Sequence, residues 1–158
     1  MAHGILITLS PKRLAQIEAE PETIDDVLEA RHDTQIPGLL DLGKAWDALD
    51  VLLSVRGKDA LLGDAVLART GEELDADGDW DHARVLAPAR VAEIATRLAA
   101  LPPTVVSERY ATLAGMQVHG GLGKDPGEIE ALELILRRLV ALYQDAARQK
   151  HSMLALMI

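Results

Sequence analysis

The two ends of the chain carry runs in which apolar residues stand at consecutive positions rather than on one face. Residues 4–9 read GILITL, and residues 152–158 read SMLALMI. Consecutive apolar residues over this length are typical of a strand that is covered on both faces. We therefore predict a strand at each end of the chain, and we expect the two strands to be neighbours at the centre of a sheet. A shorter strand is predicted at residues 82–87, HARVLA.

Between these strands, apolar residues recur three and four positions apart, the spacing of one helix face. This spacing predicts helices over residues 11–20, 22–30, 41–55, 61–69, 88–101, 104–113 and 126–150. The first of them has Ser10 as a typical N-cap, followed by Pro11. Trp46 lies on the apolar stripe of the helix at 41–55, which favours core packing. The polar or glycine-rich residues 70–81 and 114–127 are predicted to form loops.

The order of these elements decides the predicted fold class. The strands are separated by runs of helices, without the regular alternation of strand and helix that builds a doubly wound parallel sheet. The length of 158 residues is that of one domain. We therefore predict an α+β fold, a helix-rich single domain over residues 1–158. Its small sheet is formed by the N-terminal, middle and C-terminal strands.

Charge narrows the classes of partner. The chain has 16 basic and 25 acidic residues, a formal net charge of −9. Acidic proteins are repelled by phosphate backbones and by anionic membrane surfaces, so we expect neither a nucleic-acid nor a membrane partner. The chain contains no cysteine, which excludes a disulfide framework and thiolate chemistry. No basic leader precedes the first apolar run, so a cytoplasmic location is expected.

The acidic loop at residues 70–81 resembles a calcium-binding loop only superficially. Counted from Asp75, Gly78 falls at position four and Leu86 at position twelve, whereas an EF-hand loop needs glycine at six and glutamate at twelve. A solvated acidic loop is the simpler interpretation. Trp80 in this loop is either an exposed binding anchor or a side chain that folds back over the sheet edge.

The glycine-rich loop fits no catalytic or cofactor motif. His119-Gly120-Gly121 resembles the oxyanion segment of some esterases, but no serine of the chain lies in a G-x-S-x-G turn. A phosphate loop fails because Val118 stands where its first glycine belongs. A dinucleotide fingerprint fails because Pro126 replaces its third glycine. The backbone N–H groups at the following helix start could bind an anion.

Histidine spacing predicts no metal site and no cofactor. No two of the five histidines lie a helical turn apart, as metal ligands on one helix would. Because His82 and His119 flank the two irregular loops, we select them as pocket candidates. The full set of candidate binding residues is Trp46, Trp80, Asp81, His82 and His119. No catalytic residue is assigned.

Three stretches resemble the YfbM-like family, a bacterial domain of unknown function of the DUF1877 type. They are residues 41–53, residues 82–101, and the last helix with its SMLALMI end. The most specific parts are K-x-W-D-x-L from Lys44 to Leu49 and V-L-A-P-x-x-V from Val85 to Val91. The resemblance implies a single cytoplasmic α+β domain. It carries over no catalytic residue. Where family members often have a Tyr-Pro-Gly-like turn, this chain has Val118-His119-Gly120-Gly121.

Two functional hypotheses follow. The first is a non-enzymatic binding or protein-interaction module, with a protein partner that carries a basic patch, acting as a monomer or weak homodimer. Leu61, Leu62, Val66 and Leu67 would supply the dimer surface. The alternative is a small enzyme with a pocket near His82 and His119, in which Asp79 or Asp81 supplies the carboxylate for acid–base chemistry.

Overall fold

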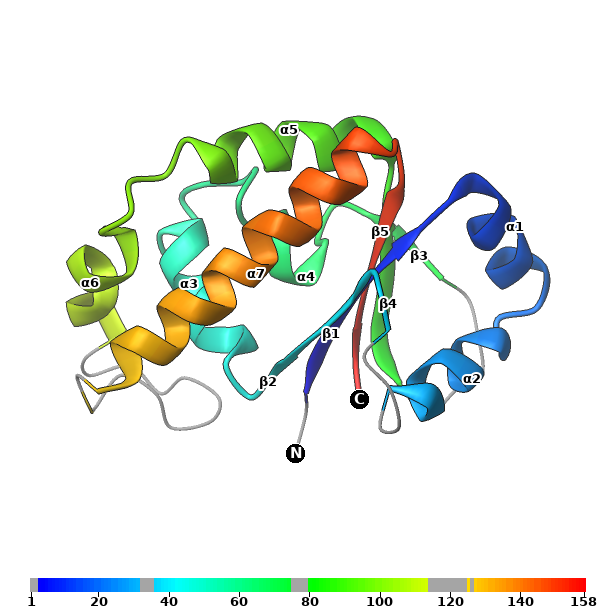
Figure 1. Cartoon of the computed structure of the whole chain (residues 1–158), viewed down its shortest axis with the longest axis horizontal. Helices are drawn as coiled ribbons and strands as arrows, with labels where there is room; N and C mark the ends of the chain where they lie inside the picture. The colour runs from blue at the N-terminus through cyan, green and yellow to red at the C-terminus, as the bar shows by residue number, and fades with distance from the viewer. Residues whose placement is uncertain (1–2, 32–35, 75–79, 114–124, 126) are drawn as a thin grey trace.

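The computed structural model describes residues 3–31, 36–74, 80–113, 125 and 127–158. Their strands form one antiparallel sheet in the order β2-β1-β5-β4-β3 (Figure 1). The strand bounds are β1 Gly4–Leu9, β2 Leu39–Gly43, β3 Glu72–Glu73, β4 Asp81–Leu86 and β5 Ser152–Met157. Together with helices on both faces, this sheet confirms the predicted α+β class.

The terminal strands β1 and β5 pair along their whole length, from Gly4 opposite Met157 to Leu9 opposite Ser152. Strand β4 flanks β5 on its other side, so the C-terminal strand is the central strand of the sheet. Leu6 in β1 and Leu154 in β5 are completely buried. The predicted pairing of the two termini is therefore confirmed, because strands covered on both faces belong inside a sheet.

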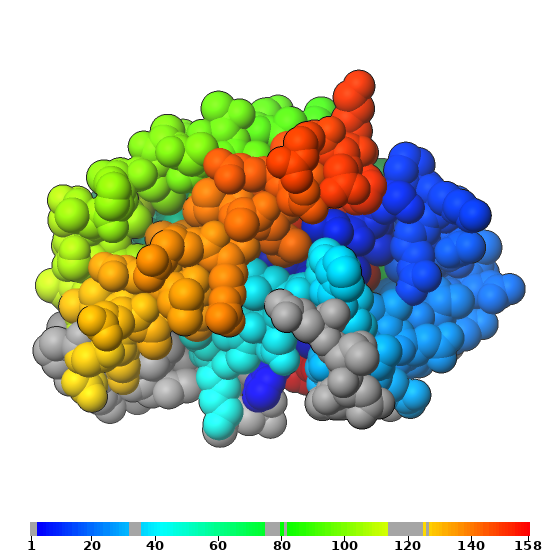
Figure 2. All heavy atoms as spheres, in the orientation of Figure 1, coloured from blue at the N-terminus to red at the C-terminus, as the bar shows by residue number. Residues whose placement is uncertain are grey.

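Helices cover the two faces of the sheet unequally (Figure 1). Two of them pack on one face: α1 Pro11–Ala19 and α2 Thr23–Ala30. The others pack on the opposite face: α3 Trp46–Ser54, α4 Asp64–Leu67, α5 Pro88–Ala99, α6 Val105–Arg109 with the 3-10 turn Tyr110–Leu113, and α7 Glu128–Arg148. In Figure 2, α7 crosses the front of the molecule below α5, and α1 and α2 lie at the right of the view.

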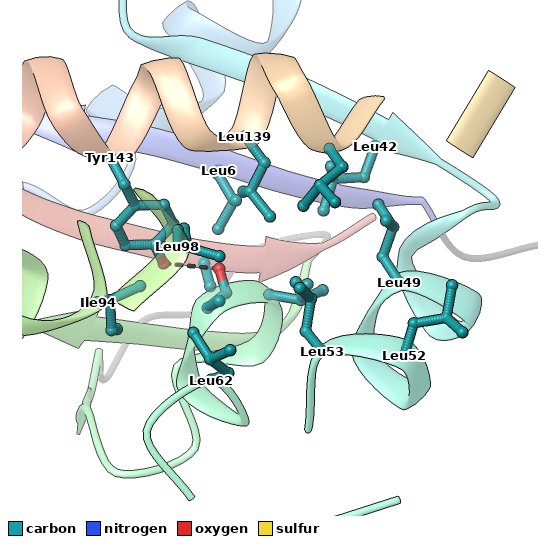
Figure 3. Close-up of a cluster of buried hydrophobic side chains, with 14 of the residues drawn as sticks. Leu6, Leu42, Leu49, Leu52, Leu53, Leu62, Ile94, Leu98, Leu139 and Tyr143 are labelled. Carbon is teal, nitrogen blue, oxygen red and sulfur yellow. Dashed lines mark hydrogen bonds between the residues drawn. The ribbon is translucent and has the colours of Figure 1, made fainter. Parts of the chain in front are cut away.

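Alternation along the strands divides the apolar residues into two cores. Leu6, Met153 and Ala155 face the larger core, which α3 to α7 complete. Leu154 and Leu156 face the smaller core under α1 and α2. Leucines dominate the larger core, and Tyr143 lies among them (Figure 3).

The helix predicted at residues 41–55 begins only at Trp46, because Leu39–Gly43 forms the edge strand β2 instead. Leu39 and Leu40 pair with Ile7 and Leu6 of β1. The Asp41 carboxylate accepts a hydrogen bond from the Gly43 N–H at 2.7 Å, and Gly43 has a φ of 56°. This left-handed residue turns the chain from strand to helix. The pairing partner β1 lies more than thirty positions away, so a local pattern could not reveal it.

The segment at residues 61–69 forms a shorter helix than predicted, since α4 spans only Asp64–Leu67. Leu62 and Val66 are buried in the larger core, and Leu61 and Leu67 pack against it. Leu62 and Val66 are therefore not available to a dimer surface, whereas Leu61 and Leu67 are half-buried. No helix in the described part of the chain is long and apolar enough to cross a membrane.

Candidate functional site

The two tryptophans lie on opposite sides of the sheet. Trp80 is 8% exposed and belongs to the smaller core with Leu154 and Leu156. It therefore folds back over the sheet rather than standing free as an anchor. Trp46 is partly buried against the larger core, beside Gly4 of β1, where an added Cβ would lie 2.7 Å from the Trp46 Cβ. Both side chains therefore pack against the sheet, each in a different core.

His82 is exposed on β4, with a left-handed φ of 52°. Its ring Nε2 lies 2.5 Å from the Leu67 carbonyl oxygen, which joins the start of β4 to the end of α4. Asp81 precedes it in β4 and pairs with Met157. His119 lies outside the described residues, as does Asp79. Among the described residues, no group of three His, Asp or Glu side chains could hold a metal ion.

A buried polar network surrounds α4. The Asp64 side chain is completely buried, and its carboxylate accepts hydrogen bonds from the Thr70 N–H at 2.9 Å and the Thr70 hydroxyl at 2.5 Å. The Arg90 Nε donates to the same carboxylate at 2.9 Å. A buried carboxylate needs such donors, because desolvation is otherwise costly. The network fixes the loop after α4 against the start of α5.

A second ion pair holds the same loop. Arg69 donates from both Nη atoms to Asp50, at 2.7 and 2.6 Å, and also to the Gly63 carbonyl at 2.6 Å. The hydrogen bond to Asp50 raises the pKa of the Arg69 guanidinium, and partial burial opposes that rise. This forked geometry is the strong form of an arginine–carboxylate pair.

Backbone constraints explain why the loop closes here. Ala68 has a φ of 48° and ends α4 in the left-handed region. At Gly71, an added Cβ would lie 2.7 Å from the Val85 carbonyl oxygen. Only glycine allows the loop to approach β4 this closely. The close approach places Thr70 within hydrogen-bond distance of the Asp64 carboxylate, and the chain then enters β3.

A cleft of about 640 Å³ lies beside this network, between α1, β3, β4 and the start of α5. This volume is within the range of small-ligand sites. We name it the α1–α5 cleft, and its lining residues are Leu14, Glu18, Thr70, Gly71, Glu72, Val85, Leu86, Ala87, Pro88, Arg90 and Ser152. It therefore combines an apolar wall with carboxylates, an arginine and hydroxyls.

The charges in the α1–α5 cleft do not balance. The Arg90 guanidinium is engaged by Asp64 and, at 3.5 Å, by Glu93. Glu18 of α1 and Glu72 of β3 are exposed, and neither forms an ion pair or side-chain hydrogen bond with any residue that the structure describes. The Arg84 guanidinium donates to the Gly71 carbonyl at 3.3 Å, so it lies near Glu72 without forming an ion pair with it. Among the described residues both carboxylates thus lack an ion-pair partner, which favours a cationic ligand.

Sequence reasoning missed this cleft, because its polar residues come from four separate segments of the chain. One signal was available for its supporting network: Asp64 is a single acid within the apolar stretch LLGDAVLA. An acid on an apolar stripe suggests a buried, hydrogen-bonded carboxylate. Nothing in the sequence pattern indicates that Glu18 and Glu72 line the same cleft.

A second hollow, of about 460 Å³, lies between α5, α6 and α7. Its walls are mainly apolar, with Leu98, Leu101, Val106 and Val140 among them, and Glu133, Arg137 and Gln144 also line it. No buried polar network like that of Asp64 adjoins it among the described residues. It therefore offers shape without the chemical features of the α1–α5 cleft.

Comparison with known proteins gives a family and a fold. The sequence profile of the family described as domain of unknown function (DUF1877) matches residues 1–156. No curated protein matches the chain in sequence. The crystal structure of YfbM, a protein of unknown function from Escherichia coli, superposes with a TM-score of 0.72 at 19% identity and covers 99% of each chain. At that identity the likeness establishes the fold alone. Since the profile spans nearly the whole chain, this protein belongs to the DUF1877 family.

Proposed function

We propose that this protein is a non-enzymatic interaction module that binds a basic segment of a partner protein in the α1–α5 cleft. The observation that carries the proposal is that Glu18 and Glu72 form no ion pair with any described residue, in a cleft whose arginine is already paired with Asp64. A cationic group would gain two charged partners there without displacing an existing ion pair.

The surface around the cleft supports the same partner. Glu20, Glu22, Asp25, Asp26 and Glu29 are exposed on the helix pair α1–α2 or on its turn, which also supplies Glu18, and they outnumber the exposed basic residues of α1, Lys12 and Arg13. Like charge gathered on one surface raises the association rate of an oppositely charged protein, and the effect weakens with salt. We expect this acidic surface to steer the basic segment toward the cleft.

The cellular setting is part of the proposal. A cytoplasmic bacterial protein, acting as a monomer or weak homodimer, agrees with the complete lack of cysteine. In the enzyme alternative His82 would have to act through its other ring nitrogen, since its Nε2 contacts the Leu67 carbonyl.

The test places a competing cation in the cleft. Ala87 lines the cleft, is exposed and makes no side-chain cap bond, so Ala87→Arg introduces a guanidinium without removing a contact. Ala92→Arg is the matched control, because Ala92 is exposed on the same helix and does not line the cleft. Thermal melts verify that both variants fold.

The readout is quantitative affinity capture of host proteins by the wild type and the two variants. We expect a basic partner to be retained by the wild type and by Ala92→Arg, released by moderate salt, and lost with Ala87→Arg. Equal retention by all three proteins, or no protein above background, would contradict the proposed function.

A further inference from the structure

The Ser152 hydroxyl stands apart from the other buried polar groups. Asp50 is paired with Arg69, Ser54 accepts from the Gly57 N–H at 3.1 Å, and Asp64 is held by Thr70 and Arg90. Ser152 is 3% exposed, lines the α1–α5 cleft and makes no side-chain hydrogen bond in the described part of the chain. A buried hydroxyl without a partner is destabilising, and a ligand in the cleft would remove that cost.

The position of Ser152 on β5 leaves its hydroxyl outside the backbone hydrogen bonds of the sheet. It shares a strand face with Leu154 and pairs through the backbone with Leu9 at the end of β1. Backbone hydrogen bonds of the sheet run in the plane of the strands, so they leave the hydroxyl available to the cleft. The hydroxyl can accept a hydrogen bond from a donor there.

Three features of the cleft define the ligand. The carboxylates of Glu18 and Glu72 favour a positively charged group, and the Ser152 hydroxyl oxygen can accept a hydrogen bond. The apolar wall favours a hydrocarbon stem. A primary alkylammonium supplies all three, because its head has three donors and its methylene chain packs on apolar surface. Arg90 does not oppose it, since Asp64 and Glu93 neutralise that guanidinium.

We propose that the α1–α5 cleft is a lysine-binding site. The lysine stem lies along Leu14 and Pro88, and the ammonium donates to the Ser152 hydroxyl oxygen while it pairs with Glu18 and Glu72. This inference rests on the proposed function, because the lysine would belong to the basic segment of the partner. Arginine could pair with Glu18 or Glu72 through its planar fork, but the single buried Ser152 hydroxyl is better matched by a compact ammonium than by that fork.

The inference is tested by titrating the full chain with Nα-acetyl-lysine methylamide and following backbone amide signals by NMR. We expect saturable shifts at Thr70, Gly71 and Ser152. The same molecule acetylated on Nε lacks the charge, so it should leave these signals unchanged. Nα-acetyl-arginine methylamide should bind more weakly than the lysine compound.

Variants assign the contacts. Glu18→Gln and Glu72→Gln should each raise the dissociation constant about fivefold, and Ser152→Ala should raise it by a similar factor. Glu29→Gln is the control for charge in general, because Glu29 is exposed on α2 and does not line the cleft. Binding that is equal in all four variants and the wild type, or equal for the charged and acetylated compounds, overturns the lysine site.

The two proposals fail separately. If no lysine compound shifts the cleft signals but Ala87→Arg still abolishes partner capture, the interaction module stands and the lysine site is overturned. If the lysine compound binds as expected but Ala87→Arg leaves capture unchanged, the lysine site stands and the proposed function is overturned.

Discussion

Among the described residues, the buried polar side chains on the α3–α7 side of the sheet have hydrogen-bond partners, whereas the buried Ser152 hydroxyl on the α1–α2 side has none. The Tyr143 hydroxyl donates to the Ala65 carbonyl at 2.6 Å (Figure 3), and Asp64 has three donors. Ser152 has no side-chain partner among the described residues. Because a satisfied network stabilises the fold on its own, the difference directs the search for a ligand to the α1–α2 side.

Arg90 joins the two sides. It donates to Asp64 within the satisfied network and also lines the α1–α5 cleft. The network thus holds one wall of the cleft in place and neutralises the arginine there. Breaking it should affect stability first and binding second.

The largest expected effect comes from Asp64→Ala. It leaves Thr70 and Arg90 without their acceptor, and we expect a loss of about 3 kcal/mol in the free energy of unfolding, at the lower end for a buried pair because Arg90 retains contact with water. Urea unfolding measures the change. Asp145→Asn, which removes an exposed pair with Arg148, should cost less than about 1 kcal/mol. Equal losses would mean that the network contributes no more than a surface pair.

Tyr143→Phe should have an intermediate effect. It removes the hydrogen bond to Ala65 and leaves a buried carbonyl unpaired, so we expect a loss of about 1–2 kcal/mol at neutral pH, measured by urea unfolding. A loss near zero would show that this side of the sheet does not depend on its hydrogen bonds.

The pH dependence of the same pair of proteins sharpens the comparison. Burial raises the pKa of the Tyr143 phenol above its ordinary value of 10.0. Below pH 10 the phenol is neutral in both states, and its contribution is complete. Above pH 10 the unfolded chain ionises first, so the wild type should lose about 1.4 kcal/mol per pH unit relative to Tyr143→Phe. Parallel unfolding curves for the two proteins above pH 10 would contradict this.

The smallest effects come from two buried serines. Ser54→Ala loses a hydrogen bond from the Gly57 N–H and should cost about 1 kcal/mol. Ser152→Ala loses no side-chain hydrogen bond to any residue that the structure describes and removes an unsatisfied buried hydroxyl, so it should leave stability unchanged or raise it by up to about 1 kcal/mol. Thermal and urea unfolding of both variants check this. A larger loss for Ser152→Ala than for Ser54→Ala would show that its hydroxyl is already satisfied and would remove the basis of the lysine site.

Local sequence patterns predict some helix starts correctly but do not predict the edge strand β2. The starts of α1 and α5 were readable because Ser10-Pro11 and Ala87-Pro88 begin a helix through their own backbone preferences. The Ser10 side chain does accept from the Arg13 N–H. The strand Leu39–Gly43 was not readable, because its pairing with β1 involves residues far away in the sequence.

The candidate site shows the same division. Trp46 was expected to pack in the core and does so, since its place on a helix stripe is a local property. Trp80 followed the packing alternative, and its neighbours Leu154 and Leu156 come from the other end of the chain. His82 and His119 are candidates because they flank irregular loops, and Asp81 is a candidate as their partner carboxylate. Neither criterion says anything of the distance between these residues in space.

The sequence by itself determined the α+β class and the central pairing of the two terminal strands, because apolar periodicity and consecutive apolar runs dictate which surfaces must be covered. Only the tertiary structure decided that Glu18, Glu72 and Ser152 share one cleft and that Asp64 neutralises the arginine in it. The physical reason is that burial is specified by local pattern, whereas charge balance and hydrogen-bond satisfaction depend on which distant segments the fold brings together.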